Sequence, residues 1–409
     1  MSENQINEAF TNAYNNFDSR PLVGETLRKF YIDDFTKDAV KSIKTTITIS
    51  KKYRKMLVIG HRGCGKSTIL NKVSEELKND FYLVSFSAAD TLNMNDVETI
   101  DILISIYLQL LNSMNERDIN VPIQRFNDVM KSVKQKLNLT EVGVTLLKIL
   151  TFKIKVENES RATLREEFRN QIEILDNSIS DCIESIDEHY KTNNNPGKDV
   201  LIIIDDLDKL LPEFAEKIFF KDSHLLTMPK AKIIYTFPLE TYYCEAFNTY
   251  VDRYEDQFIS LVVVDQNKNG DIGIQQLEKL VLKRISEQYI EEEALKEMIL
   301  SSGGLLRDLI KFMQDACKEA IVSESMIIDQ NIAEKVINKT ANQYKRLFDF
   351  PNYREYIEKI ADKSQRDEIE NIKLIYLLKY LFILEYRFED DLWYDVHPCL
   401  KKVLNGELK

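Results

Sequence analysis

Short apolar runs recur along the chain and predict the strands of a buried sheet. Each run is rich in Val, Ile, Leu or Phe and is bounded by polar residues, which is typical of a parallel strand covered on both faces. Five strands are the number expected for a compact parallel sheet flanked by helices. The five runs are Met56–Ile59, Phe81–Phe86, Val200–Ile204, Lys232–Phe237 and Phe258–Val264.

Apolar residues at spacings of three and four positions predict the helices. The longest series starts at Leu164 and ends at Ile186, and it predicts one amphipathic helix over residues 160–190. Residues 142–156 favour a β-hairpin with a turn near residues 150–151, and their first half is also compatible with a helix. Further helices are expected over residues 69–77, 93–111, 274–288, 291–300, 305–320 and 372–380, and a hairpin with an acidic tip at residues 389–391 follows the last of them.

A glycine-rich motif follows the first predicted strand. Residues 60–68 have the sequence Gly-His-Arg-Gly-Cys-Gly-Lys-Ser-Thr, which contains the pattern G-x-x-x-x-G-K-[ST] of the phosphate-binding loop of nucleoside triphosphatases. Ile69, Leu70, Val73 and Leu77 recur at helical spacing directly behind it. Strand, glycine loop and helix is the order that phosphate binding requires, because the helix N-terminus adds its positive dipole end.

Each residue type in the loop has a chemical role. Gly60, Gly63 and Gly65 let the backbone curl so that its N–H groups point inward at phosphate oxygens. Lys66 can bridge the β- and γ-phosphates, and the hydroxyl of Ser67 can ligate Mg²⁺. The residues expected to bind the nucleotide are Gly60, His61, Arg62, Gly63, Cys64, Gly65, Lys66, Ser67 and Thr68.

Two carboxylates stand at the C-terminal tip of the third apolar run. Asp205 and Asp206 directly follow Val200–Ile204. The carboxyl ends of the strands are where open α/β sheets bind their ligands. Asp205 is therefore the expected partner of Mg²⁺, through water, and Asp206 is placed to polarise the attacking water. Asp208 is a weaker candidate for that second role.

Size, charge and cysteine content narrow the function classes. The chain has 409 residues, so two or three domains are expected. Its net charge of −12 argues against avid nonspecific DNA binding. Five cysteines without a C-x-x-C pair are typical of reduced thiols in a cytosolic protein. The longest apolar stretch, residues 100–111, is too short to span a membrane, so we expect a cytoplasmic protein without membrane association.

The motifs together resemble a known group of ATPases. The chain is similar to the STAND and AAA+ branch of P-loop ATPases, in particular bacterial ATPases with an origin-recognition-like layout. The resemblance rests on residues 60–68, on residues 92–97 with Asp101, and on the segment I-I-I-D-D-L-D-K-L at 202–210. The segments G-G-L-L-R-D at 303–308 and W-Y-D-V-H-P at 393–398 add to it.

This resemblance implies a fold and a domain order. The fold is α/β: a P-loop NTPase parallel sheet core with a helical lid and a C-terminal winged-helix-like domain. The expected domains are an N-terminal segment at 1–50 that packs on the core, the ATPase core at 51–268 with an insertion at about 112–197, the lid at 269–345 and the winged-helix-like domain at 346–409.

The resemblance also implies roles for single residues. Arg307, at the start of a lid helix, would be a sensor arginine that touches the phosphates of ATP. Thr236, at the end of the fourth strand, would be a polar sensor that orients the water. Arg253 lies where oligomeric relatives have an arginine finger, and a surface arginine explains it equally well. Asp206 stands where many AAA+ members have Glu, which leaves the rate of hydrolysis open.

Several functions remain compatible with the sequence. The first is a nucleotide-driven conformational switch that binds ATP and Mg²⁺, hydrolyses ATP slowly, and acts with an effector protein or as a homo-oligomer. The resemblance suggests a bacterial antiphage defence or signalling module for it. The alternatives are a DNA-associated origin-recognition-like ATPase, a small-molecule kinase and a nucleotide-stabilised scaffold without significant hydrolysis. Residues 345–409 hold 12 Lys and Arg against 13 Asp and Glu, which disfavours nucleic acid as a partner.

Overall fold

The computed structural model describes residues 3–50, 53–120, 131–139, 148, 150–151, 154–155, 158–192, 197–265, 268, 270–348, 350–363 and 370–406. The chain divides into two compact units. The first, here called the lid unit, contains Met1–Lys41, Gly60–Lys72 and Phe258–Lys409. The second, here called the core unit, contains Ser42–Ile59 and Val73–Gln257. Each unit is built from segments that are far apart in the sequence.

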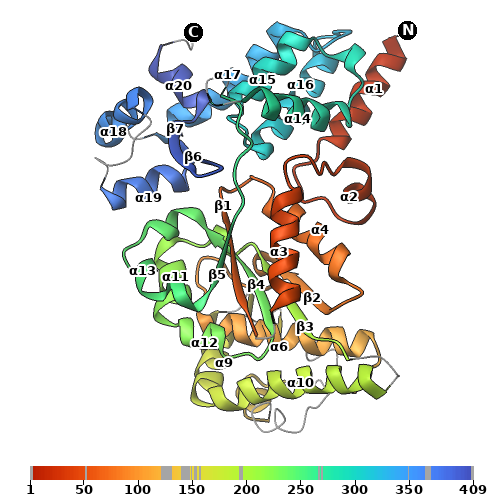
Figure 1. Ribbon diagram of the computed structural model, residues 1–409, viewed down its shortest axis with the longest axis vertical. Helices are drawn as coiled ribbons and strands as arrows, with labels where there is room; N and C mark the ends of the chain where they lie inside the picture. Colours follow the sequence, from red (N-terminus) through yellow and green to blue (C-terminus); the bar gives the residue numbers. More distant parts are fainter. Residues whose placement is uncertain are drawn as a thin grey trace. The chain divides into compact units, whose positions relative to one another are not determined.

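The core unit is organised around a five-stranded sheet in the order β2-β3-β4-β1-β5 (Figure 1). β2 pairs with β3 in parallel, with Tyr82 opposite Val200, and β3 pairs in parallel with β4. β1, β3 and β4 are almost completely buried, as their unbroken apolar runs predict. The α/β sheet core is thereby confirmed. The strands are β1 (Lys55–Gly60), β2 (Tyr82–Ser87), β3 (Val200–Asp205), β4 (Lys232–Pro238) and β5 (Glu255–Phe258).

The fifth strand was predicted at the wrong place. β5 ends at Phe258, and the apolar run that follows it, residues 259–264, is not part of a strand. This run is buried for another reason, since glycines of the lid unit approach its backbone. A Cβ atom at Gly273 would lie 1.9 Å from the carbonyl oxygen of Val263, and one at Gly304 would lie 1.8 Å from that of Val262. Burial by helices and burial in a sheet give the same apolar pattern.

Helices of the core unit pack beside the sheet, and α6, α9 and α10 contact one another (Figure 1). The predicted helix over residues 160–190 is in fact two helices, α9 and α10. The N–H of Gln171 bonds to the carbonyl of Phe168, which tightens the last turn of α9, and the carbonyl of Gln171 accepts from Leu175 in the first turn of α10. The apolar spacing continues across this one-residue break, so the pattern does not reveal it.

Most of the predicted hairpin at residues 142–156 lies outside the described residues. Those that are described, namely 148, 150, 151, 154 and 155, are helical, so the hairpin is wrong for them. The chain leaves β2 through the short helix α5. The helices of the core unit and at its boundaries are α3 (Lys37–Ile49), α4 (Lys66–Leu77), α5 (Ala88–Thr91), α6 (Thr99–Glu116), α9 (Asn158–Asn170), α10 (Ile172–Thr192), α11 (Pro212–Glu216), α12 (Ser223–Thr227) and α13 (Phe247–Tyr250).

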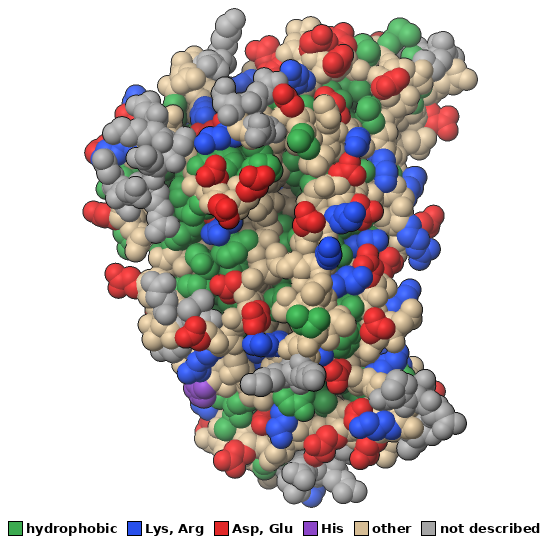
Figure 2. Space-filling view, viewed as in Figure 1, with side chains coloured by type: hydrophobic (Ala, Val, Ile, Leu, Met, Phe, Trp, Pro, Cys, Tyr) green, Lys and Arg blue, Asp and Glu red, His purple; other side chains and the backbone are tan. Residues whose placement is uncertain are grey.

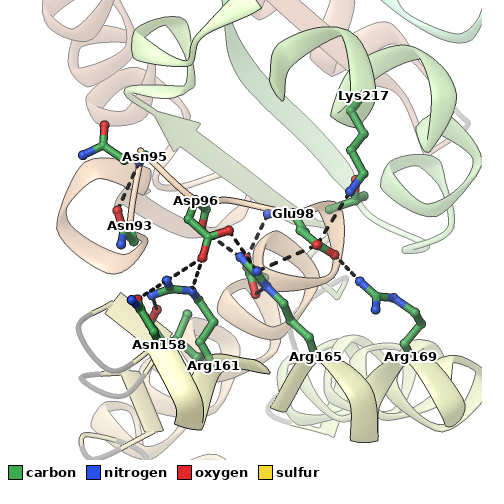
Figure 3. Close-up of polar contacts among 12 residues, drawn as sticks. Asn93, Asn95, Asp96, Glu98, Asn158, Arg161, Arg165, Arg169 and Lys217 are labelled. Carbon is green, nitrogen blue, oxygen red and sulfur yellow. Dashed lines mark hydrogen bonds and ion pairs between the residues drawn. The ribbon is translucent and has the colours of Figure 1, made fainter. Parts of the chain in front are cut away.

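Ion pairs tie α9 to the first turn of α6 and to the segment that precedes it (Figure 3). Three arginines of α9 point toward the acids of this segment. Arg161 bonds to Asp96 at 2.6 Å, and Arg165 reaches both Asp96 at 3.0 Å and Asp101 at 2.6 Å. Arg169 pairs with Glu98. Burial raises the pKa of Asp101 and Arg165 opposes that shift, so this carboxylate depends on its partner for its charge.

The lid unit contains a helical layer and a terminal hairpin. α1 packs along α16, and α17 contacts both α15 and α16 (Figure 1). β6 and β7 form an antiparallel hairpin in which Glu385 is opposite Tyr394, and the turn between them contains Glu389 and Asp390. The hairpin with an acidic tip is confirmed, whereas the winged-helix assignment stays a prediction.

Three helices of the lid unit, α15, α16 and α19, agree with the expected bounds within two residues, whereas α14 begins and ends earlier than the helix expected over residues 274–288. The helices α1, α2, α17, α18 and α20 were not predicted. The elements of the lid unit are α1 (Glu3–Asn16), α2 (Gly24–Phe30), α14 (Gly270–Leu282), α15 (Glu292–Ser301), α16 (Leu306–Val322), α17 (Gln330–Leu347), α18 (Phe350–Lys363), α19 (Asn371–Lys379), β6 (Ile383–Phe388), β7 (Asp391–Val396) and α20 (Pro398–Leu404). None of the helices in the described parts of the chain combines the length and apolar character needed to cross a bilayer.

The ion pairs of α9 generate a prediction about stability. Arg165→Met should lower the free energy of unfolding by about 3 kcal/mol, because it leaves the buried carboxylate of Asp101 without its partner. Arg169→Met is the matched control: this side chain is 59% exposed, and its loss should cost about 0.5 kcal/mol or less. Denaturant titration of the two variants measures both effects. Equal losses of unfolding free energy in the two variants would show that the buried pair with Asp101 contributes no more to stability than the exposed pair.

Candidate nucleotide site

The glycine motif forms a curled loop between β1 and α4. Gly63 has a φ of 92° and Gly65 a φ of 103°, a conformation that side chains of L-residues rarely adopt. The loop closes on itself through a bond from the N–H of Cys64 to the carbonyl of His61, and α4 begins with the bond from Ile69 to Gly65. The strand, loop and helix context predicted for the motif is confirmed.

Lys66 is buried at the loop. Its ammonium group donates to the carbonyl oxygens of Gly60 and His61, both at 2.8 Å. An ammonium group has three donors, so two bonds to fixed carbonyls set the direction of the whole group. The loop backbone thereby orients the cation that the motif assigns to the phosphates.

His61, the second residue of the motif, is buried and is held by the C-terminal hairpin. Its Nε2 accepts a hydrogen bond of 2.7 Å from the backbone N–H of Glu385 in β6. Burial, with the nearby charge of Lys66, lowers the pKa of His61 to about 3. The imidazole is therefore neutral at physiological pH and carries its proton on Nδ1.

The first turn of α16 lies directly against the loop. The N–H of Arg307 donates to the carbonyl of Gly63 at 3.1 Å. A Cβ atom at Gly63 would lie 2.7 Å from the Cβ of Arg307, and one at Gly65 would lie 3.0 Å from Cδ1 of Leu306. The glycines thus admit a helix of the lid unit as well as curling the backbone. The structure brings Arg307 to the loop, and its role as a sensor stays a prediction.

A segment of the chain before α2 also contacts the site, and sequence reasoning missed it. The N–H of Leu22 donates to the hydroxyl of Thr68 at 3.2 Å, and Asn71 donates to the carbonyl of Leu22 at 3.0 Å. Pro21 and Gly24 flank this stretch and mark a turn, but nothing else in the sequence indicates that it contacts the phosphate loop. Arg62 has a buried Nε without a hydrogen-bond partner in the described part of the chain.

The acids lie at the end of β3 in the core unit, as predicted. Asp206 has a φ of 67° and a ψ of 5°, the left-handed conformation, and its N–H bonds to Oδ1 of Asp205 at 2.7 Å. The N–H of Leu207 donates to the hydroxyl of Thr236 at 3.0 Å. Thr236 is fully buried at the end of β4, so this bond fixes the turn that carries the acids. Its role as a sensor of water stays a prediction.

Two residues around Asp206 were missed by sequence reasoning. The hydroxyl of Ser87, at the end of β2, donates to Oδ2 of Asp206 at 2.6 Å. The ammonium group of Lys209 pairs with Oδ1 at 2.5 Å. Both oxygens of this carboxylate are therefore engaged. The pairing of β2 with β3, which sets Ser87 opposite Asp205, is what brings the hydroxyl there, and the sequence does not reveal this register.

The acids fit the requirements of a divalent cation. Oxygen atoms of Asp205, Asp206 and Asp208 lie within 4.8 Å of one another. Carboxylate oxygens are the ligands that Mg²⁺ prefers. The curled glycines and the oriented ammonium of Lys66 likewise fit a phosphate chain. Ser67 as a ligand of Mg²⁺ stays a prediction.

Arg253, the residue considered as an arginine finger, bonds to the hydroxyl of Ser223 at 2.9 Å, which agrees with a structural role.

A comparison with protein families identifies the region that contains both motifs. Residues 37–238 match the KAP family P-loop domain. The KAP-like region begins with α3 and ends with β4, so it contains the glycine loop and the acids, and it covers just under half of the chain. The fold is that of a P-loop NTPase, as predicted. The finer likeness to the STAND group stays a prediction.

The whole chain is also similar in structure to three solved proteins of low sequence identity. Cdc6p from Pyrobaculum aerophilum is 11% identical, with 97% of this chain and 98% of that chain covered and a TM-score of 0.43. The ORC1 protein of Aeropyrum pernix in complex with DNA is 8% identical, with coverages of 95% and 96% and a TM-score of 0.42. The RuvB Holliday junction branch migration motor of Thermotoga maritima is 11% identical, with coverages of 96% and 99% and a TM-score of 0.38. Such scores carry no information about ligands. A comparison with curated proteins finds no match.

The buried His61 predicts a pH dependence of stability. Its pKa is about 3 in the folded chain and about 6.5 in the unfolded chain, so below pH 6.5 only the unfolded chain takes up the proton. The free energy of unfolding should therefore fall by about 1.4 kcal/mol for each pH unit between 6.5 and 3 through this group alone. His61→Gln should lack this contribution. Denaturant titrations at pH 7 and pH 5 compare the two proteins, and an identical loss in both would contradict the assignment.

Proposed function

We propose that this protein is an ATP-binding, Mg²⁺-dependent P-loop ATPase that hydrolyses ATP slowly and acts as a nucleotide-driven conformational switch. The observation that carries the proposal is the direct bond between Arg307 of α16 and Gly63 of the phosphate loop. A ligand that changes the shape of the loop must act on the lid helix bonded to it. The contact therefore gives a bound nucleotide a route to the rest of the lid unit.

Binding of the triphosphate follows from the loop. The N–H groups around Gly63 and Gly65 would donate to phosphate oxygens, and Lys66 would add its charge from a direction that the carbonyls of Gly60 and His61 already set. Ser67 and Asp205 would hold Mg²⁺, which supplies neutralisation of phosphate charge when bound. The guanidinium of Arg307 would join the γ-phosphate from the lid side.

Slow hydrolysis is the rate that the acids favour. Asp206 would orient and polarise the attacking water, but its two oxygens are engaged by Ser87 and Lys209. A carboxylate that accepts a hydrogen bond from a hydroxyl and pairs with an ammonium group has fewer lone pairs left to accept a hydrogen bond from the attacking water. The same observation favours the second candidate, a nucleotide-stabilised scaffold with negligible hydrolysis, which differs from the first only in turnover.

The choice of adenine and the partner are extensions of the proposal. Both rest on the resemblance to AAA+ and STAND ATPases, which suggests ATP and ADP as ligands and an effector protein, or a second copy of the chain, in an antiphage or signalling module. Origin-type DNA binding is less well supported. On the face in Figure 2, Lys and Arg side chains are interspersed with Asp and Glu rather than gathered in one basic surface, and the hairpin tip is acidic.

The first prediction concerns binding. Lys66→Ala should weaken the affinity for ATP by at least about tenfold, because the loop loses the cation that faces the phosphates. Isothermal titration with ATP and Mg²⁺ measures the effect. Lys72→Ala, six residues further along α4, is the matched control and should bind like the wild type. Unchanged affinity of the Lys66 variant would refute the site.

The second prediction separates binding from chemistry. Asp206→Asn should keep the affinity for ATP and lower the rate of phosphate release by about 100-fold or more. Asn tolerates the left-handed backbone of this position, so the turn should remain folded. Turnover at the wild-type rate would show that Asp208 or another group acts as the base.

The nucleotide that co-purifies with the protein tests the switch itself. It can be released by denaturation and identified by ion-exchange chromatography. Near-stoichiometric ADP or ATP would support a slowly exchanging switch. A protein that purifies without nucleotide and turns over rapidly would instead indicate a freely cycling ATPase.

A further inference from the structure

Among the described residues, β6 and β7 form a sheet of two strands, so the outer edge of β6 carries backbone groups that are not paired with a third strand there. The N–H of Glu385 is such a group, and it donates to Nε2 of His61 at 2.7 Å. An imidazole of the phosphate loop thus occupies the place that a neighbouring strand would have. Both partners are buried, so neither can exchange the bond for one to water without local opening.

The bond does not depend on pH in the physiological range. Nε2 can accept only while it carries no proton, and burial beside Lys66 keeps His61 neutral. The link between the loop and β6 is therefore constant until the two elements separate. This excludes a histidine switch operated by protonation and leaves a mechanical role.

A second set of contacts holds β6 against the lid. The hydroxyl of Tyr386 donates to the carbonyl of Gly303 at 2.8 Å. Gly303 has a φ of 59°, and a Cβ atom there would lie 2.6 Å from Cδ1 of Leu384. Two residues further, Leu305 begins the turn into α16, whose Arg307 bonds to Gly63. The phosphate loop, the hairpin, and the turn at Gly303–Leu305 with the start of α16 therefore each contact the other two.

We propose that the hairpin β6–β7 positions the phosphate loop through His61, so that docking of the hairpin and binding of nucleotide at the loop depend on each other. The inference rests on the proposed function and deepens it by naming the regulatory element. His61 is the positioning residue, because its side chain is held by β6 while its carbonyl accepts from Lys66.

The direction of the coupling follows from this double attachment. With the hairpin docked, the carbonyl of His61 stays in place and keeps the ammonium of Lys66 directed. Once the hairpin leaves, the buried Nε2 of His61 needs a new donor, and the loop must move to find one. Docking and nucleotide binding therefore strengthen each other, and the coupling is reciprocal, so each raises the affinity of the other by the same factor.

The experiment removes the bond from either side and measures ADP affinity by isothermal titration. Glu385→Pro deletes the donor N–H at an edge position where proline is tolerated, and Glu385→Gln is its matched control that keeps the N–H. His61→Phe deletes the acceptor with a ring retained. We expect about tenfold weaker ADP binding for Glu385→Pro and His61→Phe, and near wild-type binding for Glu385→Gln.

The double variant and hydrogen exchange complete the test. Combining His61→Phe with Glu385→Pro should weaken ADP binding no further than either change alone, because both changes remove the same hydrogen bond. In the wild type, saturating ADP should slow amide exchange of residues 383–388 by about tenfold. Additive losses, or exchange that ADP leaves unchanged, would overturn the inference while the proposed function stands. A wild-type protein that binds neither ADP nor ATP would overturn both.

Discussion

The close approach of α16 to the phosphate loop is the constraint on which the rest of the lid unit depends. The bond from Arg307 to Gly63 is possible only because the loop has no side chains at Gly63 and Gly65, where Arg307 and Leu306 lie. The motif is usually explained by phosphate chemistry alone. Here the same absence of Cβ atoms is also a packing requirement, so loop and lid cannot be varied independently.

Much of the fold could be predicted from the sequence. Four of the five strands and the lid helices α15, α16 and α19 are found within two residues of their predicted bounds, because apolar runs and three-to-four spacing directly report burial. Two of the failures share one cause. The run at 259–264 and the break at Gln171 both keep the expected apolar pattern, and the pattern cannot tell which neighbours bury it or whether one residue interrupts a helix.

The candidate site was predictable only in part. Lys66, Asp205 and Asp206 were found because their residue types and spacing are tied to phosphate and cation chemistry. Ser87, Lys209 and Glu385 were not, since each acts through a partner that only the folded chain brings near. Glu385 is 324 residues from His61 along the chain, and it contributes a backbone N–H that no sequence pattern can mark. The roles of Arg307 and Thr236 remain predictions that their positions permit.

The left-handed backbone of Asp206 explains the identity of that acid. Aspartate and asparagine are the side chains, besides glycine, that adopt this conformation most readily. A glutamate, as in many AAA+ proteins, would bring both conformational strain and a carboxylate one methylene further from the hydroxyl of Ser87. The shape of the chain after β3 thus selects the shorter acid before catalysis is considered. A substitution of Asp by Glu is often treated as conservative, but at this position it replaces a residue that readily adopts the left-handed conformation with one that does so less readily.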